Sequence, residues 1–258
     1  MMNVLRSAAL AFSSFSKIPM PRVEWHEKNM RYMMCFFPAV GLAQGAFLAG
    51  WFAFCQAVGV GPVLFGAGVA LVPVLVTGGI HLDGFCDVVD AQSSHASSER
   101  KREILKDPHA GAFASIAVAA YLIAYTALAT ELKTGWVVAA LLVCMHVASR
   151  CMSAIATLTY PTSSSRGMLS MFHESGNGVR VLVVIAIEFA CCAAVMIWLS
   201  APVAAAMLGS GLLLLALLYP FARTQFGGMS GDLAGFFLQV AEIAMLAVLV
   251  LVGKAVGL

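Results

Sequence analysis

The feature that most constrains this chain is a run of 51 residues, 32–82, that contains no Asp, Glu, Lys or Arg. About 20 apolar residues cross the hydrocarbon core of a bilayer, so the run is too long for one span and long enough for two. The cluster Gly59-Val60-Gly61-Pro62 divides it, because glycine and proline break a helix where water can satisfy the freed backbone. The run therefore predicts membrane helices near residues 36–58 and 62–80.

The composition of the whole chain agrees with this prediction. Of 258 residues, 61% are hydrophobic and 11% are charged, and the mean hydropathy is +0.91. A soluble domain carries roughly a quarter charged residues, which excludes a soluble enzyme, a disordered chain and a disulfide-built secreted module. We expect an all-α, polytopic membrane bundle that forms one domain over residues 1–258, with the lipid bilayer as its solvent. The predicted spans, about seven in number, are 36–58, 62–80, 108–130, 136–158, 181–199, 202–222 and 235–252.

Lysine and arginine residues are divided unequally between the two ends of these spans. With a cytoplasmic N-terminus, twelve of the 15 fall on one side, two fall on the other, and Arg150 lies within a span. Because cytoplasmic segments carry the excess of positive charge, segment 1–34, the acidic-motif loop 81–107 and the glycine-rich loop 223–235 are predicted to face the cytoplasm, and with them the active site. The twelve are Arg6, Lys17, Arg22, Lys28, Arg31, Arg100, Lys101, Arg102, Lys106, Arg166, Arg180 and Arg223, and the two are Lys133 and Lys254. The net charge of +2 offers no basic surface for nucleic acid, so no nucleic-acid partner is expected.

An acidic motif follows the second predicted span. Asp83, Asp87 and Asp90 stand at i, i+4 and i+7, so on a helix they fall within about 60° of one another. Like charges on one helix face repel, and a hard divalent cation such as Mg²⁺ is the simplest compensation. The alternative is a solvated acidic face. His81 can orient one of these carboxylates, as a member of the catalytic set, or cap the span.

A second motif, residues 227–235, has four glycines in nine positions. Glycine lets backbone N–H groups such as those of Gly228 and Gly231 approach an anion, and the following helix adds its positive dipole. Arg223 is suited to bind phosphate, and Asp232 can join a metal site or take a proton. The alternative is an ordinary flexible turn between spans.

The remaining candidates are single charged residues near or within spans. Lys106 and Asp107 precede the third predicted span, where Asp107 can cap the helix and Lys106 can be a cytoplasmic charge, or both can contact substrate. Arg150 can reach a phosphate from the cytoplasmic end of its span, or snorkel. An ion pair with Glu188 or Glu242 inside the bundle is the structural alternative.

Taken in chain order, these features resemble the cobalamin synthase family, also called adenosylcobinamide-GDP ribazoletransferase. The most specific parts are the pattern HLDG-x2-D-x2-D and the pattern GGxSGDxxG, in this order on a seven-span chain. Departures from the family pattern are Ala91, Phe236 and Gln239. The matching segments are Phe15-Ser16-Lys17-Ile18-Pro19-Met20-Pro21, Phe37-Pro38-Ala39-Val40-Gly41, residues 78–90, Lys106-Asp107 with Gly111, Ser149-Arg150, and Arg223 with residues 227–235.

The resemblance implies a reaction, a cofactor and a location. A ribose hydroxyl of α-ribazole, or of its 5′-phosphate, attacks adenosylcobinamide-GDP and releases GMP, giving adenosylcobalamin or its phosphate. The family works with Mg²⁺ and sits in the inner (plasma) membrane. The fit to this sequence is Mg²⁺ held by the three aspartates and phosphates held by Arg223 and the glycine-rich loop. Asp90 and Asp232 are both candidates for accepting the hydroxyl proton, and the sequence leaves the choice open, as it does the oligomeric state; a homo-oligomer is compatible with it.

Two other classes of protein remain as alternatives. A CDP-alcohol phosphotransferase or an intramembrane prenyltransferase also uses spaced carboxylates on membrane helices. The first needs D-G-x2-A-R, where this chain has Phe-Cys-Asp-Val after Gly84, and the second needs two Asp-rich motifs. A transporter is less favoured, because the chain shows no internal repeat and the acidic motif lies at the edge of the membrane.

Overall fold

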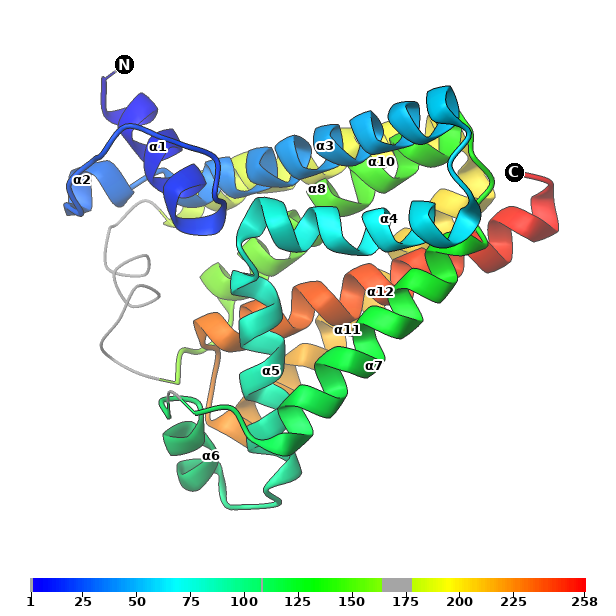
Figure 1. The fold of residues 1–258 in the computed structure, drawn as a ribbon. Coiled ribbons are helices and arrows are strands. Elements are labelled where there is room, and N and C mark those ends of the chain that lie inside the picture. Colours follow the sequence, from blue (N-terminus) through cyan, green and yellow to red (C-terminus); the bar gives the residue numbers. More distant parts are fainter. Residues whose placement is uncertain (1, 108, 164–177) are drawn as a thin grey trace.

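The computed structural model describes residues 2–107, 109–163 and 178–258, and within these residues the chain is helical with no β-strand (Figure 1). A short N-terminal part precedes the long helices, and the chain ends in two 26-residue helices that pack against each other. The helices are α1 (Met2–Phe15), α2 (Glu27–Met30), the 3₁₀ helix η1 (Met33–Phe36), α3 (Phe37–Val58), α4 (Pro62–Thr77), α5 (Ile80–Ser93), α6 (Ser98–Ile104), α7 (Ala112–Thr130), α8 (Trp136–Thr159), α10 (Gly178–Leu199), α11 (Ala201–Phe226) and α12 (Gly231–Val256).

The predicted membrane spans are confirmed as long apolar helices. Among the described residues six helices are long and apolar enough to cross a membrane, namely those ending at Val58, Thr130, Thr159, Leu199, Phe226 and Val256. The pair α4 and α5 passes the same test only when taken together, and the two are bent by 97°. The total of six, or seven with the bent pair, agrees with the predicted number of spans.

Two segments predicted as loops, residues 81–107 and 223–235, are largely helical, so these predictions are wrong. The span predicted at 62–80 ends at Thr77, and the loop predicted at 81–107 contains α5 and α6. Gly78 and Gly79 have φ of +67° and +80°, a left-handed backbone that glycine adopts without strain, and this pair makes the sharp bend. The glycine-rich loop 223–235 is also mostly helical, because α11 continues to Phe226 and α12 begins at Gly231. Most of the connection between the spans predicted at 136–158 and 181–199 lies outside the described residues.

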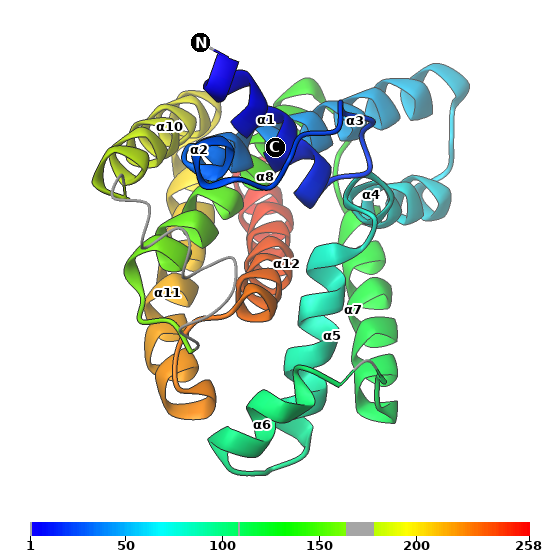
Figure 2. The same ribbon diagram turned by 90° about the vertical axis from the view of Figure 1, so that its left-hand side faces the viewer.

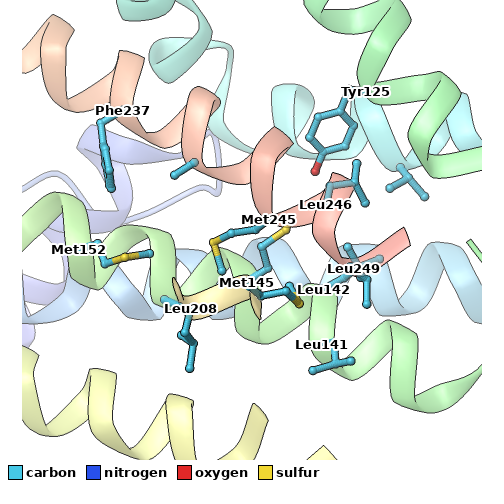
Figure 3. Packing of buried hydrophobic residues seen from close by; sticks show 14 of the residues in the cluster. Tyr125, Leu141, Leu142, Met145, Met152, Leu208, Phe237, Met245, Leu246 and Leu249 are labelled. Atoms are coloured by element: carbon cyan, nitrogen blue, oxygen red, sulfur yellow. The ribbon is translucent and has the colours of Figure 1, made fainter. Parts of the chain in front are cut away.

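The core of the bundle lies around α8 and α12. Figure 3 shows Met145 of α8 beside Met245 of α12, with Leu208 of α11 below them and Met152 farther along α8. These side chains are buried, and the flexible methionines fill the irregular spaces between the helices. The helices α8 and α12 are the fixed centre against which the shorter helices are placed.

Helix α5 runs across the direction of α4, because the chain bends by 97° between the two helices. It lies between α7 and α12 and packs against both, as the two perpendicular views show (Figure 1, Figure 2). It carries the whole acidic motif, whereas α4 before the bend is apolar. We therefore treat α4 as the membrane-embedded arm and α5 as the arm at the membrane edge.

Candidate active site

The acidic motif forms a helix face, as its spacing predicts. Asp83 lies in the first turn of α5, and Asp87 and Asp90 follow on the same side. The side chain of Asp83 is exposed, while those of the other two are partly buried. A carboxylate in the first turn interacts favourably with the positive end of the helix dipole, but this accounts for only one of the three charges.

Two glycines let α5 and α12 cross at very short range. A Cβ atom on Gly84 would lie 2.8 Å from the carbonyl oxygen of Asp232, and one on Gly235 would lie 3.0 Å from the carbonyl oxygen of His81. Only residues without a side chain permit this approach. The crossing therefore brings Asp232, which follows the acidic motif by about 145 positions in the chain, to the edge of that motif.

The gathered carboxylates disturb one another. Burial, together with the charges of Asp83, Asp232 and Asp90, raises the pKa of Asp87 to about 6. None of the four carboxylates forms an ion pair with Lys, Arg or His within the described part of the chain. The repulsion is thus left uncompensated by the protein, which is the condition that a bound cation would relieve.

Asp90 differs from its neighbours because it is already tied to the next helix. The backbone N–H of Gly111 donates to Asp90 Oδ2 at 3.2 Å. A Cβ atom at position 111 would lie 2.2 Å from Asp90 Oδ1, so a larger residue there would displace the Asp90 carboxylate. The contact fixes the start of α7 against α5 and uses part of the acceptor capacity of Asp90.

The acidic face fits a Mg²⁺ site in its chemistry but does not form a complete ligand cage. Among the described residues, no group of three or more His, Cys, Asp or Glu side chains is arranged to hold a metal ion. Mg²⁺ usually takes one or two protein carboxylates and completes its shell with water and substrate phosphates, so a full cage is not required. The crowding that raises the pKa of Asp87 is the observation that favours a cation here.

A second group of charges lies inside the bundle, where its members pair with one another; only His146 Nε2 and Arg150 Nε lack a hydrogen-bond partner among the described residues. Arg150 Nη1 donates to Glu242 Oε1 at 2.8 Å, and Arg150 Nη2 donates to Gln44. Ser149 Oγ also donates to Glu242 Oε1 at 2.8 Å, and His146 Nδ1 lies 3.2 Å from the same oxygen. Arg150 is only 1% exposed. We call Gln44, His146, Ser149, Arg150 and Glu242 the buried polar cluster; it shows that Arg150 pairs within the bundle and does not lie on the acidic face.

The chain as a whole was compared with known proteins. The model of the family described as Cobalamin-5-phosphate synthase matches residues 7–250. This chain belongs to that family. It is 36% identical over 255 residues to the adenosylcobinamide-GDP ribazoletransferase of Lachnoclostridium phytofermentans. The matched region covers 98% of this chain and 96% of the relative. A protein of the same name from Clostridium botulinum (strain Alaska E43) is 31% identical over 247 residues, covering 94% and 96%. No solved structure matches the chain significantly.

The family resemblance inferred from the motifs is therefore confirmed, and in this cobalamin-5-phosphate synthase family member one backbone donor of the glycine-rich loop is already in use. The N–H of Gly228 donates to Ala222 O at 3.0 Å, and a Cβ atom there would lie 2.6 Å from the backbone of Thr162 and Ser163. Gly231 begins α12 and is exposed, with open space where a side chain would be. The loop turns the chain and places Asp232 at the start of α12, and anion binding by the Gly231 N–H stays a prediction.

His81 is also separated from the acidic face. It precedes Asp83 by two residues, about 200° around the helix, and so points to the opposite side of α5. Its ring is buried near Phe15 and Phe37, with centroid distances of 6.3 and 5.7 Å. It lines a small cavity together with Arg150 and Glu242, so the prediction that His81 orients a catalytic carboxylate is not supported by its position.

Three other predicted residues lie on the surface. Lys106 and Asp107 are exposed, and α7 begins five residues after Asp107, so the prediction that Asp107 caps that helix is wrong. Asp107 instead accepts from the backbone N–H and the ring Nδ1 of His109, which lower its pKa. Arg223 is exposed on α11, where it donates to Tyr219 Oη at 3.4 Å.

Sequence reasoning missed two basic residues of α6. Lys101 is buried and its Nζ donates to Gln92 at 2.8 Å and to Gln225 at 2.6 Å, which ties α6 to α5 and α11. The guanidinium of Arg102 comes within 3.6 Å of the place where a side chain on Gly227 would begin. Only the count of cytoplasmic charges included these residues, and nothing in their spacing reveals that α6 folds back to the glycine-rich loop.

Proposed function

We propose that this chain transfers the cobinamide phosphate group of adenosylcobinamide-GDP to α-ribazole or α-ribazole 5′-phosphate and releases GMP. Membership of the cobalamin-5-phosphate synthase family and near full-length similarity to proteins named adenosylcobinamide-GDP ribazoletransferase support this function. The single structural observation that carries it is the gathering of four unpaired carboxylates at the crossing of α5 and α12. The same comparisons do not favour a CDP-alcohol phosphotransferase, a prenyltransferase or a transporter.

The reaction exchanges a phosphoanhydride bond of the donor's diphosphate for a phosphoester bond to the acceptor. A ribose hydroxyl of the acceptor forms a new P–O bond at the cobinamide-side phosphorus, the P–O bond to GMP breaks, and GMP leaves with the bridging oxygen. The hydroxyl proton must pass to a base. Of the two candidates, Asp90 already accepts from Gly111 N–H, so we assign the proton to Asp232.

One or two of Asp83, Asp87 and Asp90 would hold Mg²⁺, which would neutralise diphosphate charge when bound. The protein itself supplies the placement of these groups. The glycine pair Gly84 and Gly235 holds α5 against α12, so the base on α12 and the acidic face of α5 keep a fixed relation. Fixed relative position, together with electrostatic stabilisation, is how a protein accelerates phosphoryl transfer.

The test is a transfer assay with purified protein in detergent or nanodiscs. Adenosylcobinamide-GDP and α-ribazole are supplied with and without Mg²⁺, and GMP is measured by chromatography. We expect stoichiometric GMP and cobalamin product only with the metal. A parallel assay offers a CDP-alcohol donor and a prenyl diphosphate; CMP or inorganic diphosphate in place of GMP would contradict the proposal.

We also propose that the chain lies in the inner membrane with this site toward the cytoplasm. The unequal distribution of Lys and Arg supports that orientation. Single cysteines placed at Lys106 and at Lys133, in a variant without reactive native thiols, test it with a membrane-impermeant maleimide on intact spheroplasts. Labelling is expected at position 133 only, and labelling at position 106 alone would reverse the orientation.

A further inference from the structure

A cavity of about 540 Å³ lies beside Asp83 on the side of α5 away from α12. The end of α1, the bend between α4 and α5, and one residue of α7 form its walls. Its lining is mixed, with hydroxyl groups and one positive and one negative side chain. The polar lining residues used below are Ser14, Lys17, Thr77 and Asp83.

Lys17 is held at this cavity by the bend itself. Its backbone N–H donates to Val76 O at 2.7 Å, which joins the segment after α1 to the end of α4. Its aliphatic stem passes over Gly78, where a Cβ atom would lie 2.1 Å from Lys17 Cε. Gly78 therefore meets two requirements, the left-handed backbone of the bend and the space for the lysine stem.

Lys17 and Asp83 line the same cavity without touching each other. Within the described residues Lys17 takes part in no ion pair at 4.0 Å or less, although an acid faces the same space. Opposite charges that share a cavity and stay apart leave room for a third group between them. Ser14 Oγ adds a buried hydroxyl that has no hydrogen-bond partner among the described residues.

We propose that Lys17 binds the diphosphate of the nucleotide donor in this cavity, with Ser14 Oγ as an additional donor. The inference rests on the proposed function and names the residues that bind its charged substrate. An ammonium group is a common phosphate ligand and acts as a point charge. The N–H of Gly228 is already used. Lys17 and Arg223 are both exposed, but Lys17 lines the cavity that Asp83 lines, whereas Arg223 is not among its lining residues.

Three variants test the proposal. Lys17→Gln removes the charge, Lys17→Arg keeps it, and Lys28→Gln removes an exposed charge from α2, away from the cavity, as the matched control. The KM for adenosylcobinamide-GDP and the KM for α-ribazole are measured separately. Because charge-assisted hydrogen bonds are among the stronger ones, Lys17→Gln is expected to raise the donor KM about tenfold or more and leave the acceptor KM within about twofold.

A binding measurement separates this inference from the proposed function. Equilibrium dialysis of GDP against the purified protein, without acceptor, is expected to show about tenfold weaker binding for Lys17→Gln and near wild-type binding for Lys17→Arg and Lys28→Gln. If the wild-type protein releases GMP but Lys17→Gln changes neither the donor KM nor GDP binding, the role of Lys17 is wrong and the proposed function stands. If the wild-type protein fails to release GMP yet binds GDP through Lys17, the proposed reaction is wrong and the binding site stands. Equal thermal unfolding of all variants shows that Lys17→Gln is folded.

Discussion

Helix α12 carries two acidic residues, of which, among the described residues, one is paired with a basic side chain and the other is not. Glu242 lies in the buried polar cluster, where Arg150, Ser149 and His146 contact one of its oxygens. Asp232 lies ten residues earlier, about 15 Å along the helix, and forms no ion pair within the described chain. A buried charge must be paired, and Glu242 is paired by the protein. The acids around Asp232 form no ion pair among the described residues, and under the proposed function a bound cation would be their partner.

The largest effect is expected from a change at the unpaired site. Asp83→Asn should lower GMP release on the order of 100-fold or more, because it removes negative charge that a catalytic cation requires. It should leave folding unaffected, since the side chain is exposed. The transfer assay and thermal unfolding are measured together. Near-normal turnover with Mg²⁺ would remove Asp83 from the metal site.

The opposite result is expected in the buried polar cluster. Arg150→Met leaves Glu242 buried without its cation, which costs about 3–5 kcal/mol of stability. Unfolding in detergent should therefore shift strongly to lower temperature. The double variant Arg150→Met with Glu242→Leu should recover much of the loss. A single variant as stable as the wild type would show that the pair does not matter to the fold.

The crossing that links the two regions is tested by adding one methyl group. Gly84→Ala places a Cβ atom 2.8 Å from Asp232 O, and such overpacking costs about 1–3 kcal/mol. GMP release should fall as well, because Asp232 moves away from the acidic face. Gly50→Ala is the matched control, since no atom lies within 4 Å of its Cβ position. Equal behaviour of the two variants would argue against a tight crossing.

The protonation of Asp87 should make both the stability of the protein and its response to Mg²⁺ depend on pH. The folded-state pKa of Asp87 is raised from 3.8 to about 6, so folding favours its protonated form. This contribution to stability is fully present below pH 4 and is lost as pH rises through 6. Cation binding needs the ionised form, so Mg²⁺ should raise the unfolding temperature at pH 7 and much less at pH 5. Asp87→Asn should remove that pH dependence, and a Mg²⁺ effect that is equal at both values would contradict the assignment.

The smallest effect is expected at a surface ion pair. Arg100 Nη1 and Glu103 Oε2 lie 2.7 Å apart on α6, but both side chains are 65% exposed. Solvent screens such pairs, so Arg100→Gln should change the unfolding temperature by about 1 °C or less. A drop comparable to that of Arg150→Met would mean that exposure does not explain the difference between the two pairs.

The sequence predicts the parts of this structure that depend on local pattern. Runs without charge identify the spans, and the i, i+4, i+7 spacing places Asp83, Asp87 and Asp90 on one face. The same geometry places His81 on the opposite face, so its separation from the carboxylates was predictable as well. The adjacent glycines 78 and 79 signal a break, but not its angle.

Contacts between segments that are distant in the chain could not be predicted from the local sequence pattern. Nothing near Arg150 in the chain tells whether Glu188, Glu242 or a substrate phosphate is its partner, because the answer depends on how α8 and α12 pack. The approach of Asp232 to the acidic motif depends in the same way on Gly84 and Gly235. Lys17 reaches its cavity only because the chain after α1 folds back onto the end of α4.

The shortness of α4 has a consequence for the surrounding lipid. Its 16 residues rise about 24 Å, whereas the hydrocarbon core is about 30 Å thick. A bilayer adapts to such hydrophobic mismatch by thinning around the short segment. We therefore expect the headgroup layer next to α4 to be drawn inward, so that water and polar substrates could approach α5 from a local depression in the membrane surface.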